Sequence, residues 1–211
     1  MPQDSPPQYR VLVEKDVPMT TRDGLILRAD VYRPDAPGRF PVLLSRLPYN
    51  KNLRQRPGDI DYFVERGYGV IMQDTRGRFS SEGEEYYALI WEMADGYDAV
   101  EWAAGLPWAD GKVGTTGQSY LGATQYLLTP TRPPHLKAAF PVSAAADFHQ
   151  CWVYHTGGAF EFGWQIGDRL DPPEPGEYLL HNQPDMSIFD AACVINPESL
   201  ARWSGIRIPS Q

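Results

Sequence analysis

The sequence predicts an α/β fold built on a mostly parallel sheet with an antiparallel hairpin at its N-terminal end. Two short alternating segments near the N-terminus are joined by an Asp-Gly turn signal. Apolar runs and amphipathic segments then alternate over residues 40–146, and parallel strands need helical crossovers of this kind. A turn of small residues joins an apolar run to a helix-forming run within residues 113–128. The 211 residues suffice for one domain and part of a second.

The hairpin is predicted from residues 9–17 and 25–32, where apolar side chains recur at alternate positions. Asp23-Gly24 lies between them and favours a tight turn. Residues 34–38 contain two prolines and a glycine, so we expect the hairpin to end there.

The alternating part of the chain resolves into individual elements. Apolar runs at residues 40–44 and 68–73 suit strands buried on both faces. A helix is expected over residues 59–65, and a strand with its exit over residues 136–146. A second helix is expected over residues 92–104, because one helical face then carries four apolar side chains: Met93, Tyr97, Val100 and Ala104.

Residues 113–124 have the order strand, sharp turn, helix, with Ser119 at the turn. A serine in this position takes a strained backbone conformation and its hydroxyl stands clear of the sheet. Gly117 and Gly122 allow strand and helix to approach closely, and the helix amides favour negative charge beside the serine. The pattern predicts a nucleophile elbow; the alternative is a Gly-Ser turn between two buried elements.

Composition and charge exclude several classes of function. The net charge is −8 without any block of Lys or Arg, which argues against nucleic acid or an anionic membrane as partner. Residues 1–10 lack a signal-peptide core and no apolar run approaches membrane-spanning length, so we expect a cytoplasmic protein. The two cysteines, Cys151 and Cys193, match no metal spacing. No P-loop lysine follows Gly117, so we expect no nucleotide. We also expect neither a metal nor a cofactor.

The character of the chain changes after residue 147. Residues 148–164 are rich in aromatic residues and glycine and show no strand alternation, and residues 171–176 (DPPEPG) cannot form regular helix. We therefore predict a core over residues 1–147 and the beginning of a helical cap over residues 148–211. Cap aromatics, among them Trp152 and Phe160, would line an apolar substrate pocket. Inward packing within an ordinary helical subdomain is the alternative.

Four stretches together give the sequence a family resemblance: Met19-Thr20-Thr21-Arg22-Asp23-Gly24, Arg46-Leu47-Pro48-Tyr49, Gln73-Asp74-Thr75-Arg76-Gly77 with Ser81-Glu82-Gly83, and Gly117-Gln118-Ser119-Tyr120-Leu121-Gly122. In order and spacing they resemble the CocE/NonD hydrolases, which include cocaine-esterase-like enzymes, α-amino-acid ester hydrolases and X-Pro dipeptidyl-peptidases. The resemblance covers residues 10–165 and implies an α/β-hydrolase core with a helical cap. It implies that Ser119 is the nucleophile, and that the Tyr120 N–H and the Tyr49 hydroxyl form the oxyanion hole.

Asp74 and Arg76 invite a catalytic interpretation, but in α/β-hydrolases the triad acid and histidine follow the serine. We interpret them instead as a structural ion pair and turn former. The family takes its acid and base from loops beyond the cap, and none of the four histidines (His135, His149, His155 and His181) is well placed. We therefore expect the chain to be the N-terminal part of a larger hydrolase, or a naturally short and inactive protein. We expect an unpaired sheet edge to favour self-association, and with it a homo-oligomer.

The sequence thus predicts a serine hydrolase that cleaves a small-molecule ester or amide through an acyl-enzyme. An esterase of the cocaine-esterase type is the first expectation. An X-Pro dipeptidyl-peptidase or α-amino-acid ester hydrolase is the alternative; these must hold a substrate ammonium, for which Glu161 and Asp168 are candidates. The alternative from another class is an inactive fragment that binds small apolar acyl compounds or nothing.

Overall fold

The computed structural model describes residues 5–52, 57–84, 86–147, 154–155 and 159–160. For residues 57–59, 154–155 and 159–160 it describes the backbone but not the side chains. The chain divides into two units, residues 1–146 and 147–211. In the second unit, β7 (Tyr154–His155) pairs antiparallel with β8 (Ala159–Phe160). These short strands were not predicted, because two residues are too few to show an alternating pattern.

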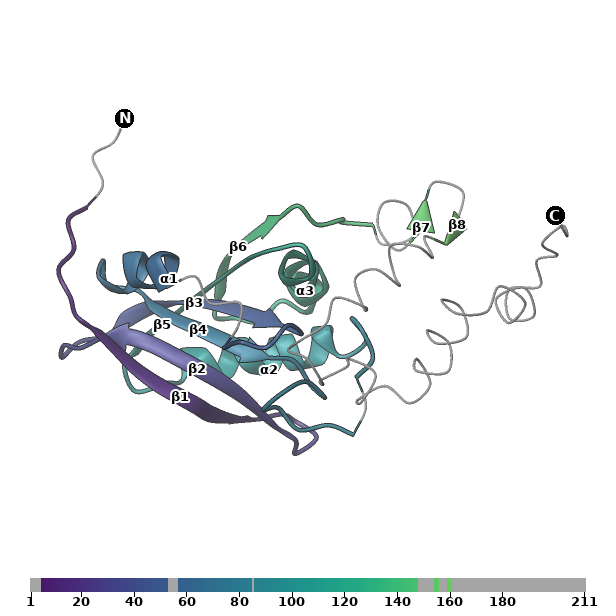
Figure 1. Ribbon diagram of the computed structural model, residues 1–211, viewed down its shortest axis with the longest axis horizontal. Helices are drawn as coiled ribbons and strands as arrows, with labels where there is room; N and C mark the ends of the chain where they lie inside the picture. Colours follow the sequence, from purple (N-terminus) through teal and green to yellow (C-terminus); the bar gives the residue numbers. More distant parts are fainter. Residues whose placement is uncertain (1–4, 53–56, 85, 148–153, 156–158, 161–211) are drawn as a thin grey trace, which may run out of the picture. The chain divides into compact units, whose positions relative to one another are not determined.

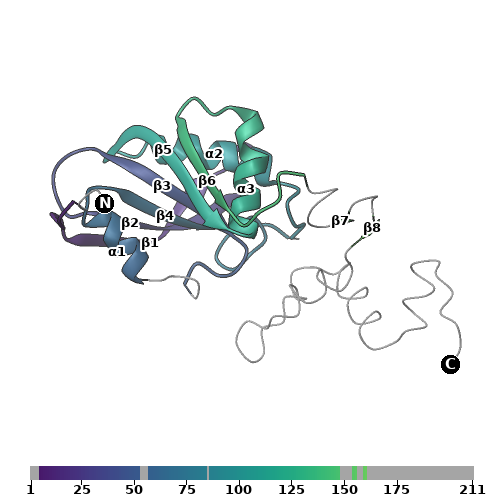
Figure 2. The same cartoon turned by 90° about the horizontal axis from the view of Figure 1, so that it is seen from above.

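The first unit is built on a six-stranded sheet in the order β1-β2-β4-β3-β5-β6 (Figures 1 and 2). Its strands are β1 (Val11–Thr20), β2 (Ile26–Pro34), β3 (Phe40–Leu47), β4 (Gly69–Asp74), β5 (Ala109–Gln118) and β6 (Leu136–Val142). Strands β3 to β6 run parallel, whereas β1 and β2 form an antiparallel hairpin and β2 pairs antiparallel with β4. The predicted mostly parallel sheet with its N-terminal hairpin is confirmed.

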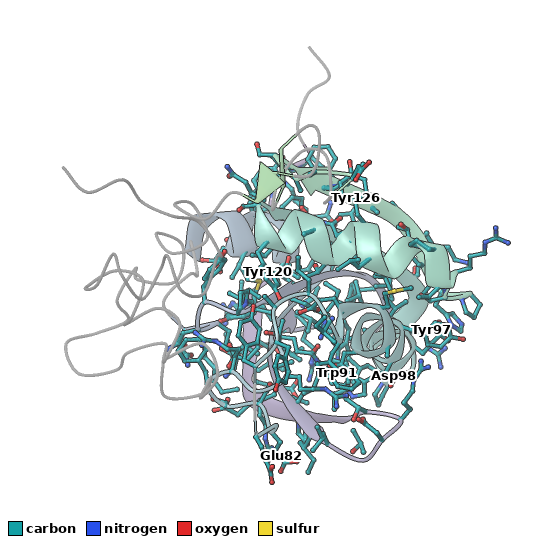
Figure 3. The ribbon with its side chains drawn as sticks, turned by 90° about the vertical axis from the view of Figure 1, so that its right-hand side faces the viewer. Glu82, Trp91, Tyr97, Asp98, Tyr120 and Tyr126 are labelled. Atoms are coloured by element: carbon teal, nitrogen blue, oxygen red, sulfur yellow. The ribbon has the colours of Figure 1, made fainter. Side chains whose placement is uncertain are left out.

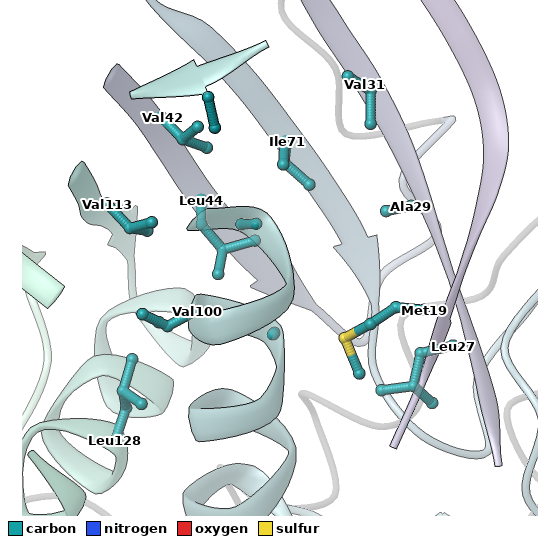
Figure 4. Close-up of a cluster of buried hydrophobic side chains, with 13 residues drawn as sticks. Met19, Leu27, Ala29, Val31, Val42, Leu44, Ile71, Val100, Val113 and Leu128 are labelled. Carbon is teal, nitrogen blue, oxygen red and sulfur yellow. The ribbon is translucent and has the colours of Figure 1, made fainter. Parts of the chain in front are cut away.

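Three helices connect these strands: α1 (Pro57–Val64), α2 (Glu92–Ala104) and α3 (Tyr120–Leu128), the last followed by the 3-10 turn η1 (Thr129–Thr131). Side chains of β2, β3 and β4 divide between two apolar clusters on opposite faces, as the period of a strand requires. Ile71 of β4 lies in the cluster under α2, shown in Figure 4, while its neighbours Val70 and Met72 lie in the cluster with α1. The sheet is thus covered on both faces.

The predicted range of α2 is correct, and of its predicted apolar face Val100 is buried and Ala104 packs against the core, but Met93 is not buried. Met93 is 46% exposed, and the buried residues of the helix are Glu92, Asp95, Gly96, Ala99, Val100 and Ala103. The helix therefore turns a stripe containing two carboxylates toward the core. Those acids are tolerated there because arginine side chains from the sheet edge pair with them, and hydrophobic periodicity alone does not register such pairs.

The parallel strands β3, β4 and β5 bring three connections to the same edge of the sheet, because their carboxyl ends point the same way. These connections are residues 48–52, residues 75–83 and the junction at Ser119. At the side of the sheet, β6 is the last strand in the described residues, and its Phe140 is 68% exposed. The candidate site lies at the carboxyl edge.

Candidate active site

Ser119 stands between β5 and α3 with φ 60° and ψ −120°. This region of backbone space is sparsely populated for a residue with a Cβ and costs about 1–3 kcal/mol. Three hydrogen bonds hold the turn: the Ser119 N–H donates to Val142 O, and Ser119 O accepts from Gly122 N and Ala123 N, all at 2.9 Å. The strain is thus supported by β6 and by the first turn of α3, and the half-buried serine lies at a sharp turn from strand to helix.

Gly117 and Gly122 are needed for this close approach of strand and helix. Gly117 has φ 148°, and a Cβ there would lie 2.3 Å from Leu121 Cβ. A Cβ on Gly122 would lie 2.6 Å from Ala144 Cβ and 3.1 Å from Val142 O. Each added carbon would displace the helix that follows Ser119, so both glycines have the steric reason that the sequence suggested.

Tyr120 is the first residue of α3, and its side chain is tied to the segment before α2. The phenol oxygen accepts a hydrogen bond from Leu89 N at 2.9 Å and donates one to Glu92 Oε1 at 3.2 Å. Figure 3 shows Tyr120 on the side of α3 that faces the segment leading to Trp91. Burial raises the pKa of this phenol well above its ordinary value, and Tyr86 and Glu92 add to the shift. The phenol of Tyr120 is thus held by hydrogen bonds to other segments. Its backbone N–H lies in the first turn of α3, where N–H groups have no acceptor within the helix.

Tyr49 follows β3 and is half-buried at the same edge. Its ring packs edge-on against the ring of Tyr120, with centroids 6.1 Å apart and an interplanar angle of 74°. Tyr49 and Leu121 also pack against one shared apolar cluster. The structure therefore brings Tyr49 beside the two residues that follow Ser119, although 70 positions separate it from the serine in sequence.

A buried carboxylate links the two tyrosine-bearing segments. Glu92 accepts a hydrogen bond from Arg46 Nη1, and Arg46 Nε donates to Gln73 Oε1 at 2.9 Å. Arg46 lies three residues before Tyr49, so Glu92 contacts both the end of β3 and the phenol of Tyr120. Burial raises the pKa of Glu92 above its ordinary value, although Arg46 opposes the shift. Sequence analysis missed this role of Glu92; an acid on the sheet-facing stripe of an amphipathic helix is the signal that could have revealed it.

Asp74 and Arg76 have structural roles, but not as partners of each other. The Asp74 carboxylate accepts hydrogen bonds from Lys51 N at 2.8 Å and Lys51 Nζ at 3.0 Å. The Arg76 guanidinium binds Asp95 at 2.6 and 3.0 Å, and Asp23 at 2.6 and 3.0 Å. The predicted pairing is therefore wrong, because each charge pairs with a segment distant in sequence rather than with its neighbour.

Among the side chains that the structure describes, the one histidine, His135, is not placed to act as a base for Ser119. His135 precedes the first residue of β6, whereas Val142, which accepts the hydrogen bond from Ser119 N, is the last residue of that strand. The Nδ1 atom of His135 lies 2.7 Å from Glu101 Oε2. The other three histidines and the predicted pocket and ammonium-binding residues lie outside the described residues or in β7 and β8, whose side chains are not described: His149, His155 and His181, and Trp152, Phe160, Glu161 and Asp168.

The described residues also bear on two other kinds of site. Within those ranges, no three His, Cys, Asp or Glu side chains come together as possible metal ligands. None of the helices described there is long and apolar enough to cross a membrane.

Comparison with known proteins places this geometry in a family. Residues 23–169 match the model of the X-Pro dipeptidyl-peptidase (S15 family). Cocaine esterase of Rhodococcus sp. (strain MB1 Bresler) is 42% identical over 165 residues, which are 74% of this chain and 28% of that protein. The chain thus spans less than a third of the length of this relative.

Solved structures agree in fold. A CocE/NonD family hydrolase from Staphylococcus aureus superposes with a TM-score of 0.61 at 30% identity, over 66% of this chain and 29% of the other. An α-amino acid ester hydrolase superposes with a TM-score of 0.66 at 22% identity, over 97% of this chain and 39% of that one, which is a likeness of fold. Taken with the sheet order and the strained serine between β5 and α3, these matches show that the chain belongs to the X-Pro dipeptidyl-peptidase (S15) family and carries part of a CocE/NonD-type α/β-hydrolase domain.

Proposed function

We propose that this chain supplies the nucleophile and the oxyanion hole of a serine hydrolase that works through an acyl-enzyme on Ser119. The observation that carries the proposal is the backbone of Ser119, held at φ 60° and ψ −120° where a parallel strand meets a helix N-terminus. Strain of this kind persists where the surrounding structure maintains it and is typical of functional positions. The packing of Tyr49 against Tyr120 supports the same assignment.

The reaction follows from these groups. Ser119 Oγ attacks the substrate carbonyl carbon, and the carbonyl oxygen takes up the electron pair as an oxyanion. The Tyr120 N–H and the Tyr49 hydroxyl donate hydrogen bonds to that oxyanion, and the dipole of α3 favours its charge. The tetrahedral intermediate collapses and expels an alcohol or amine, which receives the proton lost by the serine. Water then releases the acyl group as a carboxylic acid and restores Ser119.

A general base must carry that proton, because a serine hydroxyl at its ordinary pKa is a poor nucleophile. We propose that a histidine oriented by an aspartate comes from sequence that follows Gln211 in the complete protein. The chain order serine, acid, histidine of α/β-hydrolases supports this. The greater length of the cocaine esterase relative, of which this chain spans 28%, supports it as well.

For the substrate we propose a small-molecule ester, on the strength of the relative named cocaine esterase at 42% identity. The second candidate is a peptide or amino-acid ester with a free ammonium, favoured by the match to the X-Pro dipeptidyl-peptidase model. The two candidates differ in what the pocket must bind, because the second requires carboxylates that face the substrate ammonium. Glu161 and Asp168 remain the candidates for those carboxylates. We propose no nucleic acid, membrane or cofactor as partner.

The test compares the 211-residue chain with a product extended in the same reading frame beyond Gln211. Each is assayed with a p-nitrophenyl ester and with an X-Pro p-nitroanilide, as wild type and as Ser119→Ala. Activity of the extended protein that Ser119→Ala abolishes supports the proposal, and the preferred substrate decides between the two candidates. Failure of both forms to turn over any ester or amide, with both folded, would favour the inactive alternative.

A further inference from the structure

Tyr49 belongs to a connection between β3 and α1, a kind of segment that does not hold a side chain rigidly by itself. An oxyanion donor must stay within about 0.5 Å of its productive position. The loop after β4, residues 75–83, and Asp74 before it bind the chain on both sides of Tyr49. The proposed reaction uses none of these contacts.

The first contact follows Tyr49 and is made by Lys51, whose side chain is fully buried. Three oxygens surround its Nζ: Asp16 Oδ1 at 2.7 Å, Asp74 Oδ2 at 3.0 Å and Ser80 Oγ at 3.0 Å. Asp74 Oδ1 also accepts from Lys51 N at 2.8 Å, so one carboxylate holds both the main chain and the side chain of Lys51. Burial lowers the pKa of Lys51, but the bonds to Asp16 and Asp74 outweigh it and keep the ammonium charged.

The second contact precedes Tyr49. Arg78 is buried, and its Nε donates to Pro48 O at 2.9 Å. The guanidinium lies 5.1 Å from the centroid of the Tyr86 ring, which in turn packs against Tyr120. Arg78 therefore ties the main chain before Tyr49 to the same aromatic group that Tyr49 itself contacts.

A contribution to stability alone does not explain why these buried charged contacts are present. Burying an ammonium and a carboxylate costs desolvation that their attraction only partly returns, and apolar residues of similar size often serve stability as well. What charged contacts add is a fixed position. Asn50, between Tyr49 and Lys51, has φ 60°, a left-handed conformation that asparagine adopts more readily than most residues with a Cβ.

We propose that Lys51, Asp74 and Arg78 are positioning residues that fix Tyr49 for the oxyanion formed at Ser119. This inference rests on the proposed function and deepens it: the loop that carries the Asp-Thr-Arg-Gly stretch serves the oxyanion hole through the backbone on either side of Tyr49.

A double-mutant cycle tests the inference in the form of the protein that shows Ser119-dependent hydrolysis. The variants are Lys51→Met, Tyr49→Phe and their combination, and kcat and KM are measured for each. We expect Lys51→Met to lower kcat by about 10- to 100-fold, less than the ~10²–10³-fold expected for loss of the donor itself. In the Tyr49→Phe background, Lys51→Met should change kcat by less than about 2-fold, because the group that it positions is gone.

The matched control is Lys112→Met. Lys112 also binds an aspartate, Asp110, at 2.9 Å, but the pair lies at the amino end of β5, beside the start of β3 and at the opposite end of that strand from Tyr49. We expect it to leave kcat within about 2-fold of wild type, since a pair of the same chemistry elsewhere in the sheet does not position Tyr49.

Arg78→Met, run through the same cycle, covers the case in which Lys51→Met does not fold; circular dichroism at the assay temperature reports folding. Equal losses with and without the Tyr49 hydroxyl, or unchanged kcat, would overturn the inference, as would unfolding of both variants. Failure of the proposed function is a separate outcome: there Ser119→Ala retains activity or Tyr49→Phe alone retains wild-type kcat.

Discussion

Replacing Gly117 by alanine tests the geometry of the strand–helix junction most severely. The glycine has φ 148°, and an added Cβ would lie 2.3 Å from Leu121 Cβ and 3.0 Å from Leu121 Cδ2. Side chains rarely adopt this φ, which costs about 1–3 kcal/mol. Overpacking of a tight site costs about 1–3 kcal/mol more. We therefore expect Gly117→Ala to lower the free energy of unfolding by about 2–6 kcal/mol, a large part of the 5–15 kcal/mol typical of a domain.

Two control variants separate the contributions. Gly24→Ala meets nothing within 4 Å but also has a positive φ of 92°, so it isolates backbone strain. Gly105 has φ −81°, and an added Cβ would meet its nearest neighbours at 3.5 Å, so Gly105→Ala introduces neither backbone strain nor a clash. We expect a loss of about 1–3 kcal/mol for the first and a change within about 0.5 kcal/mol for the second.

Urea unfolding followed by far-UV circular dichroism measures all three variants, with equal m-values as the condition for comparing them. The expected order of stability loss is Gly117→Ala, then Gly24→Ala, then Gly105→Ala. If Gly117→Ala were no more destabilising than Gly24→Ala, the helix after Ser119 would not lie as close to β5 as the structure has it, and the steric reasoning would be refuted.

Three further predictions concern other parts of the molecule. Tyr49→Phe should lower kcat by about 10²–10³-fold with little change in KM, while Tyr62→Phe, at an exposed tyrosine of α1, leaves kcat unchanged; steady-state kinetics distinguish them. The bond from Arg76 holds the pKa of Asp23 well below its ordinary value, so this carboxylate stabilises the fold above the ordinary aspartate pKa and the contribution is lost as pH falls through the lowered pKa. Unfolding free energies measured from neutral to acid pH should fall less steeply in Asp23→Asn, and identical acid limbs would contradict the ion pair. Phe140→Ser, at the exposed edge strand, should change the unfolding free energy by less than about 0.5 kcal/mol and reduce self-association in light scattering; unchanged scattering would contradict a role of this edge.

The parts of the fold that sequence predicts are those whose signal is local. The hairpin follows from alternation on both sides of Asp23-Gly24, and the order of strands and helices from a switch between two periods. The strained turn at Ser119 follows from two glycines five residues apart, because the steric requirement acts across one strand–helix junction.

The parts that sequence does not predict depend on pairs distant along the chain. Periodicity finds Val100 on the buried face of α2 but misses Glu92, because Glu92 is buried in an ion pair with Arg46 of β3, 46 positions away in the sequence. Asp74 was expected beside Arg76 but binds Lys51 instead. A lysine is also the residue least expected in the interior, so only the converging carboxylates explain its burial.

The residues expected to line the pocket fall outside the described residues or have side chains that are not described there, and the base was expected from sequence that follows Gln211. Local patterns cannot place such groups, because a pocket or a triad is assembled from segments far apart in the chain. For Tyr49 a local pattern was equally weak, and the family resemblance suggested its role before the structure placed it beside Tyr120.

The central claim is that Ser119 is the residue that takes up the acyl group, and covalent trapping tests it most directly. Tryptic cleavage after Lys112 and Lys137 gives a peptide in which Ser119 is the only serine. If a form of the protein shows ester hydrolysis, treating that form with a fluorophosphonate should place the adduct on this peptide in mass spectrometry, and Ser119→Ala should remove it. An adduct on a different peptide, or none while hydrolysis continues to be blocked, would contradict the claim.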